Sequence, residues 1–485
     1  MQTKQKIGLA LGPILFLLIQ FLDFDGLNAE AQSILASTAW IAVWWITEAL
    51  PMAATALLPI ILFPLTGGLG LEKTTTTYYS PIIMLFLGGF IIAIAIERWN
   101  LHQRIALNII KIIGTNSRRI ILGFMVATAF LSMWISNTAT TLMMLPIGLA
   151  IAKKISEMNA DASGHEMQKF RKALMLGIAY AASTGGIATL IGTPTNAIFV
   201  GIVNEMFTTE ITFVQWFSFG LPLSVILLLI AWVYLTRFAF SLSTTEAEGA
   251  RREIDDHLKS FGKMSYEEKM VALVFGLTAA SWILRSFVLV KFIPNINDTV
   301  IAILGALSLF VIPASKKGKM LMNWEEAQKL PWGILILFGG GLTIAAGFTD
   351  SGLAEWVGGR LSVMQNFHYA LILLVVILLV NFFTEITSNV ATASVMLPIL
   401  ASLASSIGVH PFGLMVGASI AASCAFMLPV ATPPNAIAYS SGFLQMNDMV
   451  KNGIWMNLIS ALLLFLFIYF LMPPIWGIDL LDYPY

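Results

Sequence analysis

The sequence predicts an all-α polytopic membrane protein built as an inverted repeat, with about eleven transmembrane helices and two re-entrant hairpins. Three observations predict this class. Of the 485 residues, 58% are hydrophobic and only 11% are charged, with a mean hydropathy of +0.83, so most of the chain must face lipid or other apolar helices. Polar motifs recur in the same order in the two halves, and Lys and Arg gather in alternate connecting segments.

Composition excludes several other classes. The formal net charge is zero, which argues against nucleic acid as a partner. Cys424 is the only cysteine, so we expect neither a disulfide framework nor a cysteine-based metal site. The apolar run 7–21 follows Lys4 and Lys6 as in a signal peptide, but it lacks a small-residue cleavage site, so we expect a retained first span.

Eleven apolar runs have the length of a membrane span. They lie near residues 7–22, 34–49, 52–66, 80–97, 172–203, 217–237, 269–290, 299–313, 331–349, 411–442 and 453–474. Two further apolar segments, 118–151 and 366–403, are each interrupted by a Ser-Asn motif and a proline. We expect each to be a re-entrant hairpin, because irregular backbone at membrane depth is tolerated only where protein or a watery cavity surrounds it.

The distribution of positive charge predicts the orientation. With the N-terminus in the cytoplasm, the segments on that side hold 23 of the 27 Lys and Arg, as the positive-inside rule requires. This places the C-terminus outside, opens the first hairpin from the cytoplasm and opens the second from the exterior. Arg285 lies within a span near its outer end, where we expect it to snorkel toward water, although it could instead neutralise a substrate.

Three segments connect the spans in a recognisable way. The polar segment 241–268 is the one stretch of soluble composition, and it divides the chain into halves. The segments 99–114 and 353–364 are short and amphipathic, and each precedes a hairpin, so we expect helices in the membrane interface.

Three motifs form an internal repeat. LFLGGF (85–90) matches LFGGGL (337–342), SNTATTLMMLPI (136–147) matches SNVATASVMLPI (388–399), and GTPTN (192–196) matches ATPPN (431–435). The order is kept and the two halves have opposite orientation under the charge count. Such an inverted repeat is typical of secondary transporters, which place a binding site at the membrane midplane.

The repeated Thr-Pro-x-Asn predicts a broken helix in each half. Pro194, Pro433 and Pro434 remove backbone donors and do not fit a helix interior, so we expect the spans 172–203 and 411–442 to be split. A split helix exposes N–H groups that attract anions and C=O groups that attract cations. The two breaks and the two hairpin tips would then form an anion pocket flanked by two cation pockets.

The side chains of the motifs suit both kinds of ligand. Ser, Thr and Asn offer neutral donors to a carboxylate and hard oxygen acceptors to an alkali cation. Neither motif contains Lys or Arg, so helix dipoles and co-bound cations would have to offset the charge of an anion. The alternative is that each hydroxyl bonds back to its own helix in a packed core, but repetition of the whole set favours binding.

These motifs resemble the divalent anion/sodium symporter (DASS) family, which includes INDY-type dicarboxylate transporters. The resemblance rests on the two Ser-Asn motifs, the two Thr-Pro-x-Asn motifs and TEALPMAATALLP (47–59), and it covers nearly the whole chain. It implies a homodimer and an elevator-type movement. It also implies a scaffold formed by 1–114 and 269–364, a transport domain formed by 115–240 and 365–485, and a cytoplasmic linker at 241–268.

The resemblance also implies the site residues. The substrate would be bound by Ser136, Asn137, Thr138, Ser388, Asn389, Val390, Thr193, Pro194, Thr432 and Pro433. The first sodium site would use Ser132, Ser136 and Asn137 with the backbone at Gly192, and the second would use Thr384 and Asn389 with the backbone at Thr387 and Ala431. Val390 departs from the family pattern, which has Thr there, so one hydroxyl for the substrate is missing and a small dicarboxylate is favoured over citrate.

The expected function is transport of C4 or C5 dicarboxylates such as succinate, malate or 2-oxoglutarate. Sodium symport and sodium-independent dicarboxylate exchange both remain open, with Na+ as the coupling ion of the first, and no covalent cofactor is expected. A sodium/proton antiporter is a further alternative, because Glu48 and Glu385 lie near span or hairpin ends and would exchange protons, although both could be structural. An enzyme is not expected, since none of the five histidines lies beside a Ser-Asn motif to serve as a base.

Overall fold

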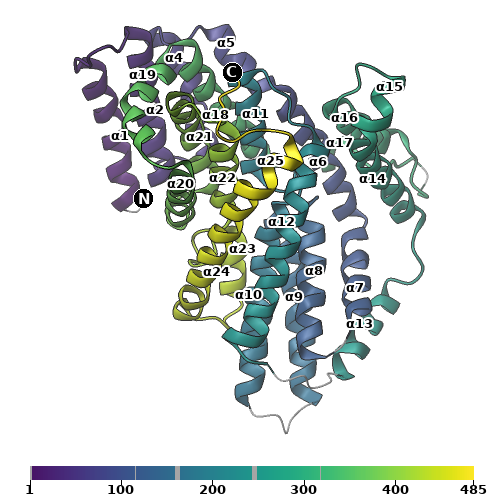
Figure 1. Ribbon diagram of the computed structural model, residues 1–485. Helices are drawn as coiled ribbons and strands as arrows, with labels where there is room; N and C mark the ends of the chain where they lie inside the picture. The colour runs from purple at the N-terminus through teal and green to yellow at the C-terminus, as the bar shows by residue number, and fades with distance from the viewer. Residues whose placement is uncertain (1–2, 115, 159–163, 243–247, 317) are drawn as a thin grey trace.

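The computed structural model describes residues 3–114, 116–158, 164–242, 248–316 and 318–485, and these are almost entirely helical (Figure 1). An isolated β-bridge joins Pro313 and Met320. Eight described helical runs are long and apolar enough to cross a membrane, or nine if the pair 353–366 and 369–383, bent by 119°, forms one span. The predicted all-α membrane fold is confirmed, while the count of eleven spans and two hairpins stays a prediction.

The helices of the first half-chain follow the predicted runs closely. They are α1 (Thr3–Phe21), α2 (Ala29–Thr47), α3 (Met52–Thr55), α4 (Leu58–Thr66), α5 (Leu71–Thr76), α6 (Pro81–Arg98), α7 (Leu101–Ile113), α8 (Ser117–Ser132), α9 (Asn137–Met158), α10 (Gly164–Gly186), α11 (Pro194–Phe207) and α12 (Phe213–Val233). A 3-10 turn lies at Thr77–Tyr79, and a π-helical turn at Tyr234–Ala239 extends α12.

The second half-chain repeats this order after one helix in the polar linker. Its helices are α13 (Glu248–Ser260), α14 (Tyr266–Leu284), α15 (Val290–Phe292), α16 (Asp298–Val311), α17 (Trp324–Ala327), α18 (Trp332–Asp350), α19 (Leu353–Leu361), α20 (Tyr369–Phe383), α21 (Asn389–Ile407), α22 (Pro411–Ser423), α23 (Pro433–Ser440), α24 (Met446–Leu466) and α25 (Met472–Trp476). Further π-helical turns lie at Arg285–Leu289 and Phe467–Leu471, and a 3-10 turn lies at Ser362–Asn366.

Both Thr-Pro-x-Asn segments interrupt a helix. In the first, α10 ends at Gly186 and α11 begins at Pro194, and in the second, α22 ends at Ser423 and α23 begins at Pro433. Each new helix starts at its proline because the first helical position needs no N–H donor and because the fixed φ of proline suits it. Below, residues 187–193 are called the first break and residues 424–432 the second break.

The helices around the two breaks pack in matching pairs. Helices α8 and α9 both contact α10, as α20 and α21 both contact α22. Across the halves, α10 and α9 contact α23, while α22 and α21 contact α11. Figure 1 shows this group at the centre of the molecule, between α1–α5 on one side and α14–α17 on the other. Each half-chain therefore supplies the helices that cover the break of the other.

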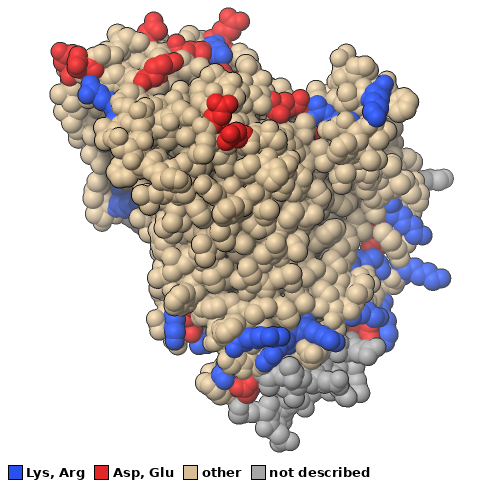
Figure 2. All heavy atoms as spheres, in the orientation of Figure 1, with Lys and Arg blue, Asp and Glu red and all other residues tan. Residues whose placement is uncertain are grey.

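Charged side chains separate along the long axis of the molecule. Figure 2 shows Lys and Arg gathered at the end where α9, α10 and α13 lie, and Asp and Glu mainly at the opposite end, near α4, α5 and α19. The two charged ends are separated by a broad surface almost without Lys, Arg, Asp or Glu on this face. A surface of this kind suits a lipid bilayer, with the basic end on the cytoplasmic side; the orientation of the termini stays a prediction.

Arg285 does not snorkel, and the prediction for this residue was wrong. Its side chain is buried, and Nη1 lies 2.6 Å from Glu210 Oε1 and 3.3 Å from Asp298 Oδ2. Nε also donates to Ile296 O at 3.1 Å. The side chain stays inside because two carboxylates and a carbonyl within reach replace the water that snorkelling would provide.

Candidate binding site

The first Ser-Asn motif lies at the turn between α8 and α9. Ser132, the last residue of α8, is buried, and its Oγ lies 2.6 Å from Asn137 Oδ1 and 2.7 Å from Ala182 O of α10. Ser136 Oγ accepts the N–H of Ala139 at 3.2 Å and so caps the start of α9. The turn is thereby attached to the helix that leads into the first break.

The second motif repeats this geometry at the turn between α20 and α21. Thr384 follows the last residue of α20, is buried, and places Oγ1 2.7 Å from Asn389 Oδ1 and 3.0 Å from Ala422 O of α22. Thr384 corresponds to Ser132 and Asn389 to Asn137 in the repeat. A hydroxyl, an amide and a helix carbonyl therefore meet in the same way in both halves.

The amide of Asn137 also reaches the first break. Turned with its nitrogen toward the break, the amide donates to Gly192 O at 3.2 Å and to Ala182 O at 3.3 Å. In the opposite orientation of the amide, Asn137 Oδ1 takes the place of the nitrogen. It then forms a group of four oxygen atoms with Ser132 Oγ, Gly192 O and Ala182 O. Two ligands that each lie about 2.4 Å from a small hard cation and at right angles to one another are about 3.4 Å apart. The distances from the Asn137 side chain to Gly192 O and Ala182 O, 3.2 and 3.3 Å, are close to this spacing.

Glycine is required where the first turn meets the first break. A Cβ on Gly186 would lie 2.8 Å from Asn137 Oδ1 and 3.0 Å from Gly192 O. A larger residue would push the amide away from the carbonyls, so the close approach of the two segments depends on this position.

The asparagine of each Thr-Pro-x-Asn motif closes its break. Asn196 Nδ2 donates to Thr189 O at 2.8 Å and to Gly186 O at 3.3 Å. Asn435 Nδ2 donates to Leu428 O at 3.0 Å and to Ala425 O at 3.1 Å. Both side chains are fully buried. Because each amide satisfies carbonyls that the interrupted helix leaves unpaired, these residues hold the breaks in shape.

Hydroxyl groups join the first break to the other half-chain. Ser423 Oγ lies 2.7 Å from Thr195 Oγ1 and 3.3 Å from Thr193 Oγ1, and Ser419 Oγ donates to Thr195 O at 3.0 Å. All four side chains are buried. Thr193 thus contacts the end of α22, and its role in binding a substrate stays a prediction.

The remaining predicted site residues differ in their surroundings. Thr387 Oγ1 lies 2.8 Å from Thr392 Oγ1 and donates to Phe383 O, so its hydroxyl is engaged locally. Thr432 Oγ1 accepts the N–H of Asn435 at 3.3 Å. The side chains of Thr138, Ser388, Val390 and Pro194 are half-buried, Pro433 is exposed, and Ala431 is buried.

Sequence reasoning missed two buried residues of this region. Asn196 and Asn435 were seen only as parts of a motif, although their identical place in both copies was the signal. Glu385 was weighed both as a proton carrier and as a structural residue, and its carboxylate accepts hydrogen bonds from the second break. The described residues contain no group of three His, Cys, Asp or Glu that could hold a metal ion.

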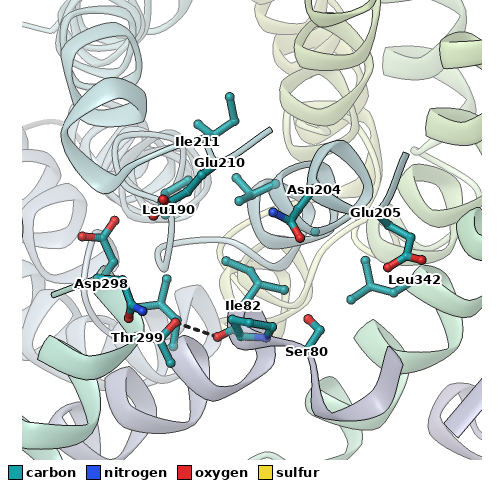
Figure 3. Close-up of a pocket in the computed structure, with 15 residues that line it drawn as sticks. Ser80, Ile82, Leu190, Asn204, Glu205, Glu210, Ile211, Asp298, Thr299 and Leu342 are labelled. Carbon is teal, nitrogen blue, oxygen red and sulfur yellow. Dashed lines mark hydrogen bonds between the residues drawn. The ribbon is translucent and has the colours of Figure 1, made fainter. Parts of the chain in front are cut away.

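A cavity of about 250 Å³ lies elsewhere, between α6, α11, α16 and α18. Figure 3 shows Ser80, which directly precedes α6, and Ile82 of α6 facing Asn204 and Glu205 of α11 across it. None of the predicted site residues lines this cavity. Glu205, which lines the cavity, places Oε1 3.0 Å from Lys73 Nζ.

The family of the chain follows from comparison with known proteins. Residues 4–477 match the family described as "Sodium:sulfate symporter transmembrane region". The chain belongs to this family of membrane transporters. The resemblance to the divalent anion/sodium symporters inferred from the motifs is therefore confirmed.

Relatives of this sodium:sulfate symporter family member are similar over almost their full length. The sodium-dependent dicarboxylate transporter SdcS of Staphylococcus saprophyticus is 48% identical over 481 residues, which is 98% of this chain and 93% of that protein. SdcS of a bovine strain of Staphylococcus aureus is 49% identical over 482 residues, with the same coverage. Both are named as transporters, which agrees with the expectation that the chain is not an enzyme.

Two solved structures share the fold at low sequence identity. MtrF of Neisseria gonorrhoeae has a TM-score of 0.55 and 12% identity, covering 93% of this chain and 96% of that one. The YdaH transporter of Alcanivorax borkumensis has a TM-score of 0.56 and 13% identity, covering 91% and 98%. At this identity the likeness concerns the fold alone.

Proposed function

We propose that this chain is a secondary active transporter that moves C4 and C5 dicarboxylates, such as succinate, malate and 2-oxoglutarate, together with Na+. The observation that supports this most is the duplicated contact of a hydroxyl, an amide and a helix carbonyl, at Ser132 and Asn137 and again at Thr384 and Asn389. Relatives named as sodium-dependent dicarboxylate transporters, 48% identical over nearly the whole chain, support the substrate class and the ion.

The dicarboxylate would be bound by helix N-termini and neutral donors. Helix α9 begins at Asn137 and α21 begins at Asn389, while α11 and α23 begin at the prolines of the two breaks. The unpaired N–H groups of such ends carry partial positive charge and attract carboxylates. Their side-chain donors would be Ser136, Asn137, Thr138, Ser388 and Asn389, with Thr193, Pro194, Thr432, Pro433 and Val390 completing the wall of the pocket.

Two sodium ions would lie beside the substrate, one at each turn. The first would be bound by Ser132, Ser136 and Asn137 with Gly192 O, and the second by Thr384 and Asn389 with the backbone at Thr387 and Ala431. The spacing of Asn137 Oδ1 from Gly192 O supports the first of these sites. Neutral oxygen ligands leave the positive charge of the ions available to balance the substrate.

Coupling has an electrostatic reason. Moving a dianion into an inside-negative cell costs about 4.6 kcal/mol at 100 mV, since each charge costs about 2.3 kcal/mol. Two co-transported Na+ cancel this cost and a third reverses it. Exchange of one dianion for another would cancel it without sodium, so the sodium requirement is the property that distinguishes the two modes.

The proposal includes the arrangement in the membrane. Eleven spans and two hairpins that enter from opposite faces would place the turns at the midplane, with the N-terminus cytoplasmic and the C-terminus extracellular. The segments 115–240 and 365–485 would move as one transport domain against a scaffold of 1–114 and 269–364, in a homodimer. The matched packing of α8–α12 with α20–α24 supports movement of these helices as a unit.

Uptake into proteoliposomes tests the function. We expect labelled succinate to accumulate when Na+ is outside, and to fall to background when choline replaces Na+ on both sides. Counterflow against a panel of acids should show preference for C4 and C5 dicarboxylates over citrate. Full exchange without sodium would replace the symport proposal with an exchanger, and movement of protons without any dicarboxylate would replace it with an antiporter.

A further inference from the structure

Glu385 is a buried acidic residue that the proposed binding of substrate and sodium does not use. It lies in the turn between α20 and α21, directly after Thr384, and only 3% of its surface is exposed. Its Oε1 accepts the N–H groups of Phe426 and Met427 at 2.8 and 2.9 Å, and its Oε2 accepts that of Leu428 at 2.9 Å. Asn457 Nδ2 of α24 donates to Oε1 at 2.7 Å.

These bonds replace the ones that the second break lacks. Helix α22 ends at Ser423, and residues 424–428 continue without helical structure. Without Glu385, the N–H groups of Met427 and Leu428 would have no acceptor, while the N–H of Phe426 would keep only Asn457 Oδ1, at 3.1 Å. Each buried N–H left without an acceptor costs about 1–3 kcal/mol. In the described part of the chain, the four hydrogen-bond partners of the Glu385 side chain are all donors, and hydrogen bonds from such donors to a carboxylate are charge-assisted and strong.

The first break has no such anion. Met133 occupies the position that corresponds to Glu385, and its backbone carbonyl lies 2.5 Å from Thr189 Oγ1. The N–H groups of Ile187 and Ala188 donate to Thr184 O and Gly185 O, so they continue the turns of α10. The two breaks therefore differ in their hydrogen bonds. At the start of the first break, backbone N–H groups donate to carbonyls of α10 itself, whereas in the second break they donate to the side chain of Glu385, from the turn between α20 and α21.

The opened segment leads into the second cation pocket. Leu428 is held from both sides, because its N–H donates to Glu385 and its carbonyl accepts from Asn435 Nδ2. The N–H of Ala431, whose carbonyl is a proposed sodium ligand, also donates to Leu428 O at 3.1 Å. Thr384, a second proposed ligand, directly precedes Glu385 in the chain and donates to Ala422 O, in the last turn of α22 before the break.

We propose that Glu385 is a positioning residue that gives the second cation pocket its shape and makes that pocket depend on a buried carboxylate, whereas the first does not. This inference rests on the proposed sodium-coupled transport. Glu385 contacts neither ion nor substrate; it acts through residues 426–428, and its negative charge beside Thr384 favours a cation over an anion at this end of the site. Loss of the carboxylate should weaken one sodium site and spare the other.

The test substitutes Glu385→Gln in the full chain. The amide keeps the shape and one acceptor, but it places an NH2 group against a backbone N–H. We expect the Na+ concentration for half-maximal succinate uptake to rise roughly tenfold, since a bond to a charged group contributes at least that factor. The Hill coefficient for Na+ should fall toward one, while the maximal rate at saturating Na+ changes less than twofold.

Two measurements separate positioning from a general structural effect. Hydrogen exchange of the peptide that covers 426–428 should accelerate in Glu385→Gln, while the peptide that covers the first break should exchange as in the wild type. Stabilisation of the purified protein by Na+ alone, read as a rise in Tm, should decrease. Glu325→Gln makes the same chemical change at an exposed position and should leave all of these readouts unchanged.

The outcomes distinguish this inference from the function on which it rests. If the wild type shows no Na+-dependent uptake and no stabilisation by Na+, the proposed function fails. If the wild type depends on Na+ and Glu385→Gln keeps its half-maximal concentration and Hill coefficient, the positioning role is wrong while the function stands. Should Glu385→Gln not fold, Asn457→Ala, which removes one of the four donors, should raise the half-maximal Na+ concentration by a smaller factor; an unchanged value would again overturn the role.

Discussion

Asn196 and Asn435 make the same pair of hydrogen bonds, each reaching back ten and seven residues across a break. The carbonyls are those of Gly186 and Thr189 in the first half, and those of Ala425 and Leu428 in the second. The asparagine of the Thr-Pro-x-Asn motif thus stabilises the break in the helix in each half-chain. Its preservation in both copies concerns shape as well as ligand binding.

Removing either amide should destabilise the protein. Asn435→Ala leaves the buried Ala425 O without its donor and removes one of the two donors to Leu428 O, which should cost about 1–3 kcal/mol, and Asn196→Ala should have a similar effect. The measurement is the Tm of the purified protein in detergent. Asn366→Ala, the same change at an exposed residue, serves as the control; equal Tm values for all three variants would show that the amides do not support the breaks.

Asn137→Ala should abolish transport and leave the fold intact. The change removes the amide that contacts Ser132 and lies beside Gly192 O, so both the proposed first sodium site and a substrate donor are lost. Because Asn137 is half-buried at the start of α9, the cavity left behind is small. Size-exclusion profiles should match the wild type while uptake of labelled succinate falls to background. Wild-type uptake would count against the site.

Val390→Thr should widen the range of substrates. The new hydroxyl would stand at the half-buried start of α21, where the family pattern has one. One added bond to a carboxylate should lower the half-inhibitory concentration of citrate in a succinate uptake assay about tenfold. Val395→Thr, the same change at a half-buried position farther along α21, should have no such effect. Unaltered citrate inhibition in Val390→Thr would mean that position 390 does not face the substrate.

Arg285 and Lys73 should differ strongly in their contribution to stability. Arg285→Leu leaves the buried Asp298 without its ion-pair partner and should cost about 3–5 kcal/mol. Lys73→Ala breaks an ion pair whose Lys side chain is 48% exposed and should cost less than about 1 kcal/mol. Thermal unfolding of both variants checks the contrast, and a larger effect for Lys73→Ala would contradict the assignment of Arg285 as the buried member.

The parts of the fold that depend on neighbouring residues could be predicted from the sequence. Pro194 and Pro433 predicted the broken helices because proline lacks the N–H donor that a helix interior requires. The apolar runs predicted the spans by their length alone. The repeat matched Asn137 with Asn389 before their contacts were known, whereas Ser132 and Thr384 were named through the family resemblance.

Contacts between distant segments could not be predicted in this way. Arg285 was expected to reach water because its partner Glu210 lies 75 residues away in the chain. The bonds of Glu385 to the second break span 41 to 43 residues, and the contact of Thr195 with Ser423 spans 228. Such pairs depend on how helices are placed in space, and one sequence without its relatives carries no signal for that placement.

The exchange of partners between halves, with α11 against α22 and α23 against α10, has a consequence for how such a protein could arise. Neither half-chain can complete its own core, so an ancestral gene of half the present length would have needed two copies inserted in opposite directions. Separate expression of residues 1–240 and 269–485 should therefore yield insoluble fragments when each is made alone, and an assembled complex when both are made in the same cell.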